Sequence, residues 1–173
     1  MKITNRKTVY EGFFNVEKLT LEHEGQKLER DIYRNKDSVA ALVYDTARKE
    51  FILIEQYRLA AERPLLEIVA GLMDKEGESP EKTIAREIEE ETGYRPDRLE
   101  PIAVFYTSPG ATAEKMYLYF AEVSERTGTG GGVETENEHI NTLAFSAEKL
   151  KAQTFEDAKT LLAVNWLQAR GRL

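Results

Sequence analysis

Hydrophobic and polar residues alternate along the first part of the chain, which is the pattern of strands with one buried face. From about Thr8 to Tyr33 this alternation predicts a β-hairpin that turns around Glu24-Gly25-Gln26. Ser38 to Tyr44 and Glu50 to Gln56 are richer in apolar residues and predict two core strands, joined by a turn over residues 45–49. We therefore expect this part of the chain to be sheet.

The middle of the chain predicts a strand, a turn and a helix in succession. Leu65 to Ala70 is nearly all apolar and predicts a buried strand, and Gly71 begins the turn that follows it. A helix is expected over about Pro80 to Thr92, because Ser79 is a good N-cap, proline suits the first helical position, and Gly93 can take the left-handed conformation that closes a helix.

The last third of the chain predicts more strands and two helices. Ile102 to Tyr106, Met116 to Val123 and Ile140 to Phe145 are strand-like, Ser146 caps a short helix, and Glu156 to Arg170 forms the last helix. Strands interleaved with few helices indicate an α+β domain with a mixed sheet. In the last helix, the residues expected to pack against that sheet are Leu161, Leu162 and Trp166.

The composition bounds the class of protein. At 173 residues, 41% of them hydrophobic, the chain is long enough for one domain with a real core. It has no cysteine, which excludes disulfides and indicates the cytoplasm. No membrane is expected as a partner, because no apolar run approaches spanning length and residues 1–10 lack a signal-peptide core. A net charge of −7 argues against nucleic-acid binding and favours a small phosphorylated metabolite.

Several carboxylates follow the glycine turn at helical spacing. Glu87, Glu90 and Glu91 project together from the predicted helix, and Arg86 lies one turn before Glu90, where it can pair with it. Taken alone, such a glutamate run is more often a solvated helix face. Grouped carboxylates repel one another unless cations neutralise them, and hard oxygen ligands suit Mg²⁺ or Mn²⁺ better than zinc. The same residues therefore also predict a site for divalent metal ions.

These residues resemble the Nudix box of the Nudix hydrolases, whose pattern is Gly-x5-Glu-x7-Arg-Glu-U-x-Glu-Glu-x-Gly-U, where U is a bulky apolar residue. The positions in register with the box are Glu78, Arg86, Glu87, Ile88, Glu90, Glu91, Gly93 and Tyr94. Gly71 departs from the pattern, because six residues separate it from Glu78. The extra residue, within residues 74–77, lengthens the turn and leaves the helix register unchanged.

The resemblance implies a role for each position of the box. Glu87 and Glu91 are expected to be the principal metal ligands, with the carbonyl of Ala70 as a third and Glu90 as a direct or water-mediated contact. The resemblance implies structural roles for Gly71, Glu78, Arg86 and Gly93, and it implies that Glu78 and Arg86 orient the helix and the loop through an ion pair.

A catalytic base is expected in the stretch Gly128 to His139, where low side-chain content is followed by glutamates. From composition alone this is a surface hairpin loop, or a mobile loop that can bring a carboxylate to a substrate. The resemblance to the dimeric ADP-ribose and GDP-mannose hydrolases of the family implies that Glu136 or Glu138 is the base or a further metal ligand. The choice between them stays open.

The resemblance also implies residues that bind the substrate. Arg58, at the end of a predicted strand, matches an arginine that contacts substrate, and Glu67 begins the Glu-x-x-Ala-Gly element of the same branch. Arg30, in the N-terminal hairpin, is a further candidate across a dimer interface.

Two later segments complete the expected substrate site. Pro109 and Gly110 belong to a Ser-Pro-Gly turn that accompanies the ADP-ribose and GDP-mannose enzymes. Lys159, near the start of the last helix, is placed to reach a substrate phosphate. Each of these residues taken alone is equally consistent with a solvated side chain or an ordinary turn.

The resemblance implies the Nudix-type α/β/α sandwich for residues 37–173, preceded by a small β subdomain over residues 1–36 that serves in homodimerisation. The implied activity is Mg²⁺-dependent hydrolysis of a nucleoside diphosphate sugar, of the ADP-ribose or GDP-mannose type, to a nucleoside monophosphate and a sugar phosphate. A hydrolase of oxidised nucleoside triphosphates would share the box and is one alternative. A non-catalytic ligand sensor is another, although it would be expected to lose Glu87 or Glu91.

Overall fold

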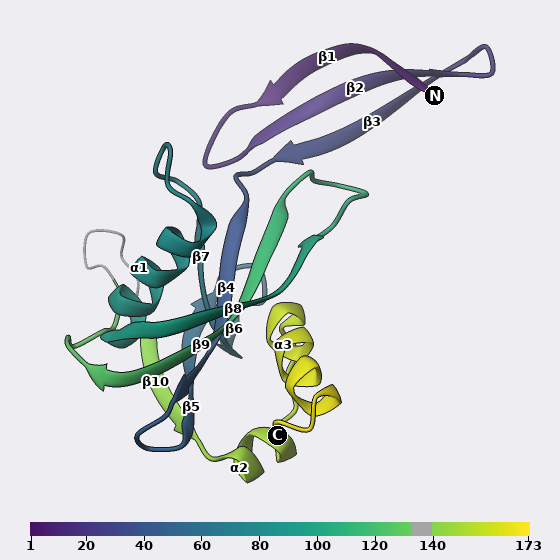
Figure 1. Cartoon of the computed structure of the whole chain (residues 1–173). Helices are drawn as coiled ribbons and strands as arrows, with labels where there is room; N and C mark the ends of the chain where they lie inside the picture. Colours follow the sequence, from purple (N-terminus) through teal and green to yellow (C-terminus); the bar gives the residue numbers. More distant parts are fainter. Residues whose placement is uncertain (133–139) are drawn as a thin grey trace. The chain divides into compact units, whose positions relative to one another are not determined.

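The computed structural model describes residues 1–132 and 140–173 (Figure 1). It divides into two compact units. The first unit contains residues 1–37 and 105–116, and the second contains residues 38–104 and 117–173. Each unit is described below by itself.

The first unit is built on a three-stranded antiparallel sheet in the order β1-β2-β3. Its strands are β1 (Lys2–Tyr10), β2 (Asn15–His23) and β3 (Gln26–Arg34). The predicted hairpin is confirmed, because His23 pairs with Gln26 around a turn in which Glu24 and Gly25 have φ angles of 50° and 77°. Strand β1 was not predicted, and every residue in it is exposed.

Residues 105–116 of the first unit form a turn beside β3. The carbonyl of Ser108 accepts hydrogen bonds from the amides of Ala111 and Thr112, each at 2.9 Å. The amide of Tyr33 donates to the carbonyl of Ala111 at 2.9 Å, which joins the turn to the end of β3. The predicted turn at Pro109 and Gly110 is therefore present within this unit.

The second unit begins with two strands that pair briefly and then separate. Strands β4 (Ser38–Asp45) and β5 (Glu50–Arg58) pair only from Val43 to Asp45, next to their connecting turn. Beyond that point β5 pairs with β6 (Arg63–Glu67) and β4 pairs with β7 (Val69–Leu72). The predicted single strand from Leu65 to Ala70 is therefore wrong, since the chain breaks at Ile68 to pass from one partner to the other.

Among the described residues the full sheet has seven strands, with the order β10-β5-β4-β9-β8 and with β6 and β7 paired as above. Its remaining strands are β8 (Tyr94–Tyr106), β9 (Lys115–Arg126) and β10 (Ile140–Phe145). The first two are longer than predicted, and their far ends belong to the first unit.

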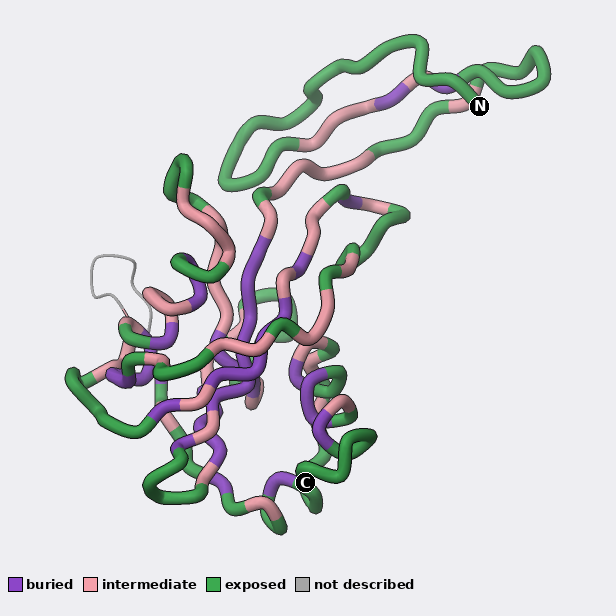
Figure 2. Tube along the Cα trace, in the orientation of Figure 1, coloured by how far each residue is buried: buried purple, intermediate pink, exposed green. Residues whose placement is uncertain are grey.

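Helices cover both faces of this sheet. Strand β4 is buried at every position from Ser38 to Val43, although successive side chains point to opposite faces, so each face must be covered (Figure 2). Helix α1 (Pro80–Thr92) packs Ile84 and Ile88 on one face, and α3 (Ala158–Ala169) lies on the other (Figure 1). This arrangement confirms the predicted α+β sandwich.

Helix α1 forms over the residues that the sequence predicts. The Ser79 hydroxyl accepts the amide of Lys82 at 3.4 Å, and Gly93 has a left-handed φ of 75°. Both ends are therefore set by local chemistry that the sequence already contains. The short helix α2 (Ala147–Ala152), with Ser146 as its N-cap, is also as predicted.

Helix α3 begins later and presents a different face than predicted. Asp157 is its N-cap, and the buried residues are Thr160, Ala163, Val164 and Leu167. Leu161 and Leu162 are 45% and 40% exposed, so their predicted packing is wrong. A face of spacing i, i+3, i+4, i+7 that starts at Thr160 turns both leucines outward. Among the described residues, no helix has the length and apolarity needed to cross a membrane.

Candidate active site

The break at Ile68 places the backbone of β7 beneath the side chains of α1. A Cβ atom added to Gly71 would lie 2.1 Å from Cδ of Glu87 and 2.4 Å from its Oε1. The Glu87 carboxylate therefore lies directly against the strand at the residue after Ala70, and a Cβ atom at position 71 would force this carboxylate to move. This contact brings together one predicted metal-ligand side chain and the strand that carries the predicted carbonyl ligand.

Arg86 holds the carboxylates at this end of α1. Its Nη1 lies 2.8 Å from both Glu87 Oε1 and Glu90 Oε2, and its Nη2 lies 3.3 Å from Glu78 Oε2. Burial alone lowers the pKa of Arg86, but the charge of Glu87 and the hydrogen bonds to Glu90 and Glu78 outweigh it and raise that pKa. The predicted ion pairs of Arg86 with Glu90 and Glu78 are present.

The longer turn before α1 keeps Glu78 in reach of Arg86. The amide of Asp74 donates to the carbonyl of Leu72 at 2.9 Å, and Gly77 takes a left-handed φ of 77°. The extra residue is therefore absorbed in a tight turn. Glu78 also accepts the Thr83 hydroxyl at 3.0 Å, so it ties the turn to the first turn of the helix.

Glu91 is the most buried carboxylate of the helix, with only 2% of its surface exposed. Glu87 and Glu91 are one helical turn apart, so both project from the same side of α1. Their donor atoms, with a backbone carbonyl at Ala70, are the hard oxygens that Mg²⁺ and Mn²⁺ prefer. Within the described residues no three acidic or imidazole groups are arranged as a ready-made metal site. The fit of this site to a divalent metal ion therefore rests on Glu87 and Glu91 and on the close contact of Gly71 with the Glu87 carboxylate.

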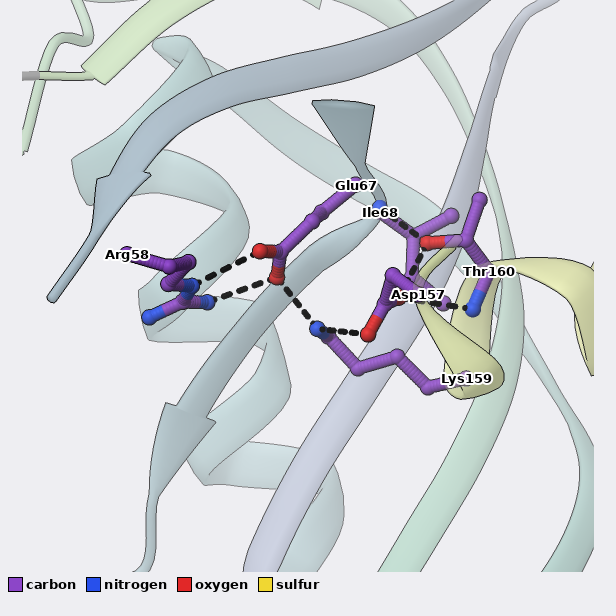
Figure 3. A network of polar contacts seen from close by, with 6 residues as sticks. All are labelled: Arg58, Glu67, Ile68, Asp157, Lys159 and Thr160. Carbon is purple, nitrogen blue, oxygen red and sulfur yellow. Dashed lines mark hydrogen bonds and ion pairs between the residues drawn. The ribbon is translucent and has the colours of Figure 1, made fainter. Parts of the chain in front are cut away.

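A second set of charges gathers where β5, β6 and α3 meet (Figure 3). Arg58 donates through Nε and Nη2 to the two oxygens of Glu67, each at 2.7 Å. Lys159 donates from the other side to Glu67 Oε2 and to Asp157 Oδ1, the latter at 3.0 Å. Two cations therefore share one oxygen of a buried carboxylate.

The ionisation of this network follows from its contacts. Burial alone raises the pKa of the Glu67 carboxyl, but the hydrogen bonds from Arg58 and the charge of Lys159 outweigh it and hold the pKa below its ordinary value. The hydrogen bond to Glu67 raises the pKa of Arg58, and the charge of Glu91 adds to this. Arg58 is therefore close enough to Glu91 for the two charges to interact, which connects the network to the carboxylates of α1.

The strand break itself is held by the first turn of α3. The amide of Ile68 donates to the hydroxyl of Thr160 at 2.9 Å, and this hydroxyl donates to the carboxylate of Asp157. No role was predicted for Asp157 or Thr160 from the sequence. An aspartate three residues before a threonine at a helix start is a capping signal, but it does not indicate which strand the hydroxyl contacts.

The other predicted site residues lie in the first unit or outside the described residues. Arg30 is exposed on β3, where its Nη1 donates to the carbonyl of Glu29 at 2.7 Å. Pro109 and Gly110 are exposed in the turn of the first unit. Glu136 and Glu138, the predicted bases, lie outside the described residues.

A cavity of about 630 Å³ opens beside β5, β10 and the end of α1. Its lining includes Arg48, Tyr94, Arg126 and Thr142, and it contains none of the carboxylates of the box or of the charges around Glu67. Acidic residues at positions 50 and 55 also face it. The cavity has cations in its lining but no box carboxylate that could hold a metal ion, so we place the candidate active site at the two clusters described above.

The chain is similar to known proteins along most of its length. Residues 34–164 match the NUDIX domain, and the chain belongs to the Nudix family. It is 33% identical to a GDP-mannose pyrophosphatase of Cronobacter sakazakii, over 99% of this chain and 96% of that protein. It is 35% identical to an ADP-ribose pyrophosphatase of Escherichia coli, over 97% of this chain and 88% of that protein. The family predicted from the box is thus confirmed.

One further relative and one solved structure are also similar to this chain. The chain is 35% identical to a methanol dehydrogenase activator of Bacillus methanolicus, over 86% of this chain and 81% of that protein. A crystal structure of an ADP compounds hydrolase superposes with a TM-score of 0.81, over 99% of this chain and 96% of that chain, at 24% identity. The structural likeness supports the Nudix sandwich as the fold.

Proposed function

We propose that this protein is a Mg²⁺-dependent hydrolase of a nucleoside diphosphate sugar, which it cleaves at the diphosphate to a nucleoside monophosphate and a sugar phosphate. The observation that carries the proposal is the meeting of two clusters at one strand break. Carboxylates for a metal ion lie on α1 against Gly71, and two cations for phosphate lie around Glu67. A diphosphate needs both, because its charge must be neutralised on each side before water can attack.

The metal ion is assigned to the carboxylates of Glu87 and Glu91 and the carbonyl of Ala70, with Glu90 beside them. When bound, a divalent ion supplies neutralisation of charge on the phosphate oxygens and a lowered pKa for a coordinated water. Arg86 holds Glu87 and Glu90 in their positions on the helix. Mn²⁺ is expected to substitute, since it favours the same oxygen ligands.

Arg58 is assigned to the diphosphate. Glu67 binds its Nε and Nη2, so the guanidinium is held in one plane with its remaining nitrogen directed away from Glu67. That orientation is what a phosphate-binding arginine needs, because less rotational entropy is lost when the substrate binds. Lys159 supplies the second cation, with Glu67 as the carboxylate that keeps the two together.

The base that takes a proton from water is assigned to Glu136 or Glu138. These residues follow Gly132 by four and six positions in the sequence, and the amide of Gly132 donates to the carbonyl of Glu90 at 3.1 Å. The chain therefore enters this acidic stretch from the end of the helix that carries the metal ligands. Arg30, Pro109 and Gly110 are assigned to substrate contacts on the first unit.

A nucleoside diphosphate sugar is favoured over a nucleoside triphosphate by the relatives. Those that cover nearly the whole chain are named for ADP-ribose and GDP-mannose. The identity of the base and the sugar is left open by the proposal, because both names occur at similar identity.

We further propose that the protein is a homodimer joined through its N-terminal sheet. Phe13 is 86% exposed and Tyr10 is 55% exposed, and only Leu19 and Leu21 are buried within the three strands. A sheet that buries so little apolar surface gains stability when a second copy covers it.

The proposal is tested by measuring the release of monophosphate from a panel of compounds with and without Mg²⁺. The panel contains ADP-ribose, GDP-mannose, ADP-glucose, UDP-glucose and an oxidised dGTP. We expect Mg²⁺-dependent cleavage of one or more of the diphosphate sugars. Turnover that does not need a metal ion, or turnover of the triphosphate alone, would contradict the proposal.

A further inference from the structure

The last turn of α1 ends against the glycine-rich segment of residues 127–132, which follows β9. The amide of Gly132 donates to the carbonyl of Glu90 at 3.1 Å, and the amide of Gly131 donates to that of Glu91 at 2.8 Å. The amides of Thr127 and Gly128 both donate to the carbonyl of Gly93, at 2.8 and 2.9 Å. Carbonyls that a helix leaves without partners at its end are thus bound by this segment.

The contact is so close that it requires glycine on both sides. A Cβ atom at Gly130 would lie 2.6 Å from the backbone carbon of Thr92 and 2.7 Å from the carbonyl oxygen of Glu91. A Cβ atom at Gly93 would lie 2.3 Å from the carbonyl oxygen of Gly128. Gly130 also has a left-handed φ of 67°, which side chains rarely adopt. Backbone therefore packs directly on backbone at this point.

Arg126 fastens the segment to the helix from the side. Its Nε donates to the carbonyl of Thr92 at 3.1 Å, and its Nη2 donates to the carbonyl of Thr129. A cation is favourable at this end of a helix, where the dipole is negative. With Arg126 and the amides above, the carbonyls of residues 90 to 93 all have partners from beyond the helix.

We propose that residues 127–132, held by Arg126, form a glycine clamp that positions Glu90 and Glu91 for the metal ion. The carbonyls that the clamp binds belong to these same two glutamates, so it fixes the backbone from which their carboxylates project. A metal site needs its ligands held to within about half an ångström. Arg126 is a positioning residue, because it acts through the helix end and not on the substrate. This inference rests on the proposed function.

The inference is tested by metal binding to the substrate-free protein. The variants are Gly130→Ala, Arg126→Ala and Arg126→Lys, and the matched control is Gly171→Ala. Gly171 has a similar φ of 62°, but no heavy atom lies within 4 Å of the position that a Cβ atom would take there, so the control carries the strain of the conformation without the close contact. Mg²⁺ affinity is measured by calorimetry, Mn²⁺ affinity by electron paramagnetic resonance, and folding by circular dichroism.

We expect Gly130→Ala and Arg126→Ala to weaken metal binding by about tenfold or more, the loss typical when groups that orient metal ligands are removed. Arg126→Lys should fall between, because lysine replaces the charge but cannot bridge two carbonyls in one plane. Gly171→Ala should bind as the wild type does. At saturating Mg²⁺ the KM for substrate should stay within about twofold, since Arg58 is untouched.

The outcomes separate the inference from the function on which it rests. A wild-type protein that binds no divalent metal ion overturns the proposed function. A wild type that binds metal, together with folded clamp variants that bind it equally well, overturns the clamp alone. If Gly130→Ala does not fold, the metal affinity of Arg126→Ala tests the clamp by itself. This substitution removes side-chain contacts without adding an atom to the packed backbone.

Discussion

Glu87 and Glu91 lie one turn apart on the same helix, yet their surroundings differ. The Glu87 side chain keeps 13% of its surface exposed and is paired with Arg86, whereas Glu91 is almost completely buried. A buried carboxylate is costly unless a cation compensates it. In the proposed site the metal ion would compensate the buried charge of Glu91, whereas Glu87 shares its charge with Arg86.

This difference predicts the effect of Glu91→Gln. The amide keeps the size of the side chain but loses the charge that a metal ligand needs, so kcat should fall by at least about 100-fold. The matched control is Glu89→Gln, on the exposed side of the same helix, which should leave kcat within about twofold. Steady-state rates and circular dichroism of both variants check this. An unaffected rate in Glu91→Gln would remove that residue from the metal site.

A second prediction at the residue scale concerns how the contribution of Glu67 to the free energy of unfolding depends on pH. Its pKa is lowered in the folded protein, so its contribution to stability is complete above the ordinary glutamate pKa, about 4.3, and is lost as the pH falls through the lower folded value. Glu67→Gln leaves two cations without their carboxylate and should lower the free energy of unfolding by about 1 to 4 kcal/mol at pH 7.

The measurement is urea unfolding of the wild type and of Glu67→Gln between pH 3 and pH 7. The difference in stability should shrink as the pH falls, because protonation of Glu67 in the wild type removes the same charge. A difference that stays constant over this range would show that ionisation of Glu67 contributes nothing.

At the scale of elements, α3 supports the candidate active site from the face of the sheet opposite α1. Its first turn binds the amide of Ile68 through Thr160 and the carboxylate of Glu67 through Lys159. A strand break leaves an amide that no neighbouring strand can bind, and an unpaired buried amide is costly. The helix start therefore completes the sheet at the position where the sheet is interrupted.

Thr160→Val tests this support. Valine fills the same space without a hydroxyl, so the buried amide of Ile68 loses its acceptor and the free energy of unfolding should fall by about 1 to 3 kcal/mol. The control is Thr46→Val, because the carbonyl of Val123 that accepts the Thr46 hydroxyl also accepts the Thr46 amide, at 2.8 Å, and keeps that partner. Equal effects of the two variants in denaturant unfolding would contradict the account.

The elements that the sequence predicts well are those whose determinants are local. The limits of α1 follow from Ser79 and Gly93, which act on neighbouring residues. The break at Ile68 could not be predicted, because its acceptor Thr160 lies 92 positions away. The outward face of Leu161 and Leu162 could not be predicted for a related reason, because the buried face of α3 depends on contacts with distant residues, such as that of Thr160 with Ile68.

The same holds for the candidate site, where local features were predicted and a contact that depends on strand pairing was not. The carboxylates of the box were found because their helical spacing is visible in the sequence, and the ion pair of Arg86 with Glu78 is present as predicted. The bidentate contact between Arg58 and Glu67 was not foreseen, because it depends on how β5 and β6 pair. The metal, base and substrate roles stay predictions that the proposed experiments test.

At the scale of the whole molecule, the proposed dimer has a direct test. Phe13→Asp places a charge on an aromatic position that is 86% exposed in the single chain, and a dimer that buries it should dissociate. Leu59 is equally exposed at 86%, so Leu59→Asp is the control and should leave the molar mass unchanged. Light scattering with size exclusion measures both. A wild type that runs as a monomer at micromolar concentration would contradict the dimer.

The contact between the start of α3 and Ile68 has a consequence for folding during synthesis. The acceptor for the Ile68 amide and the lysine beside Glu67 are synthesised more than 90 positions after the strand that they support. A nascent chain can form α1 with its own caps, but it cannot hold the strand break until the ribosome has released the start of α3. Contacts of such long sequence separation also slow folding. The candidate site should therefore be complete only after residues 157–160 have been synthesised.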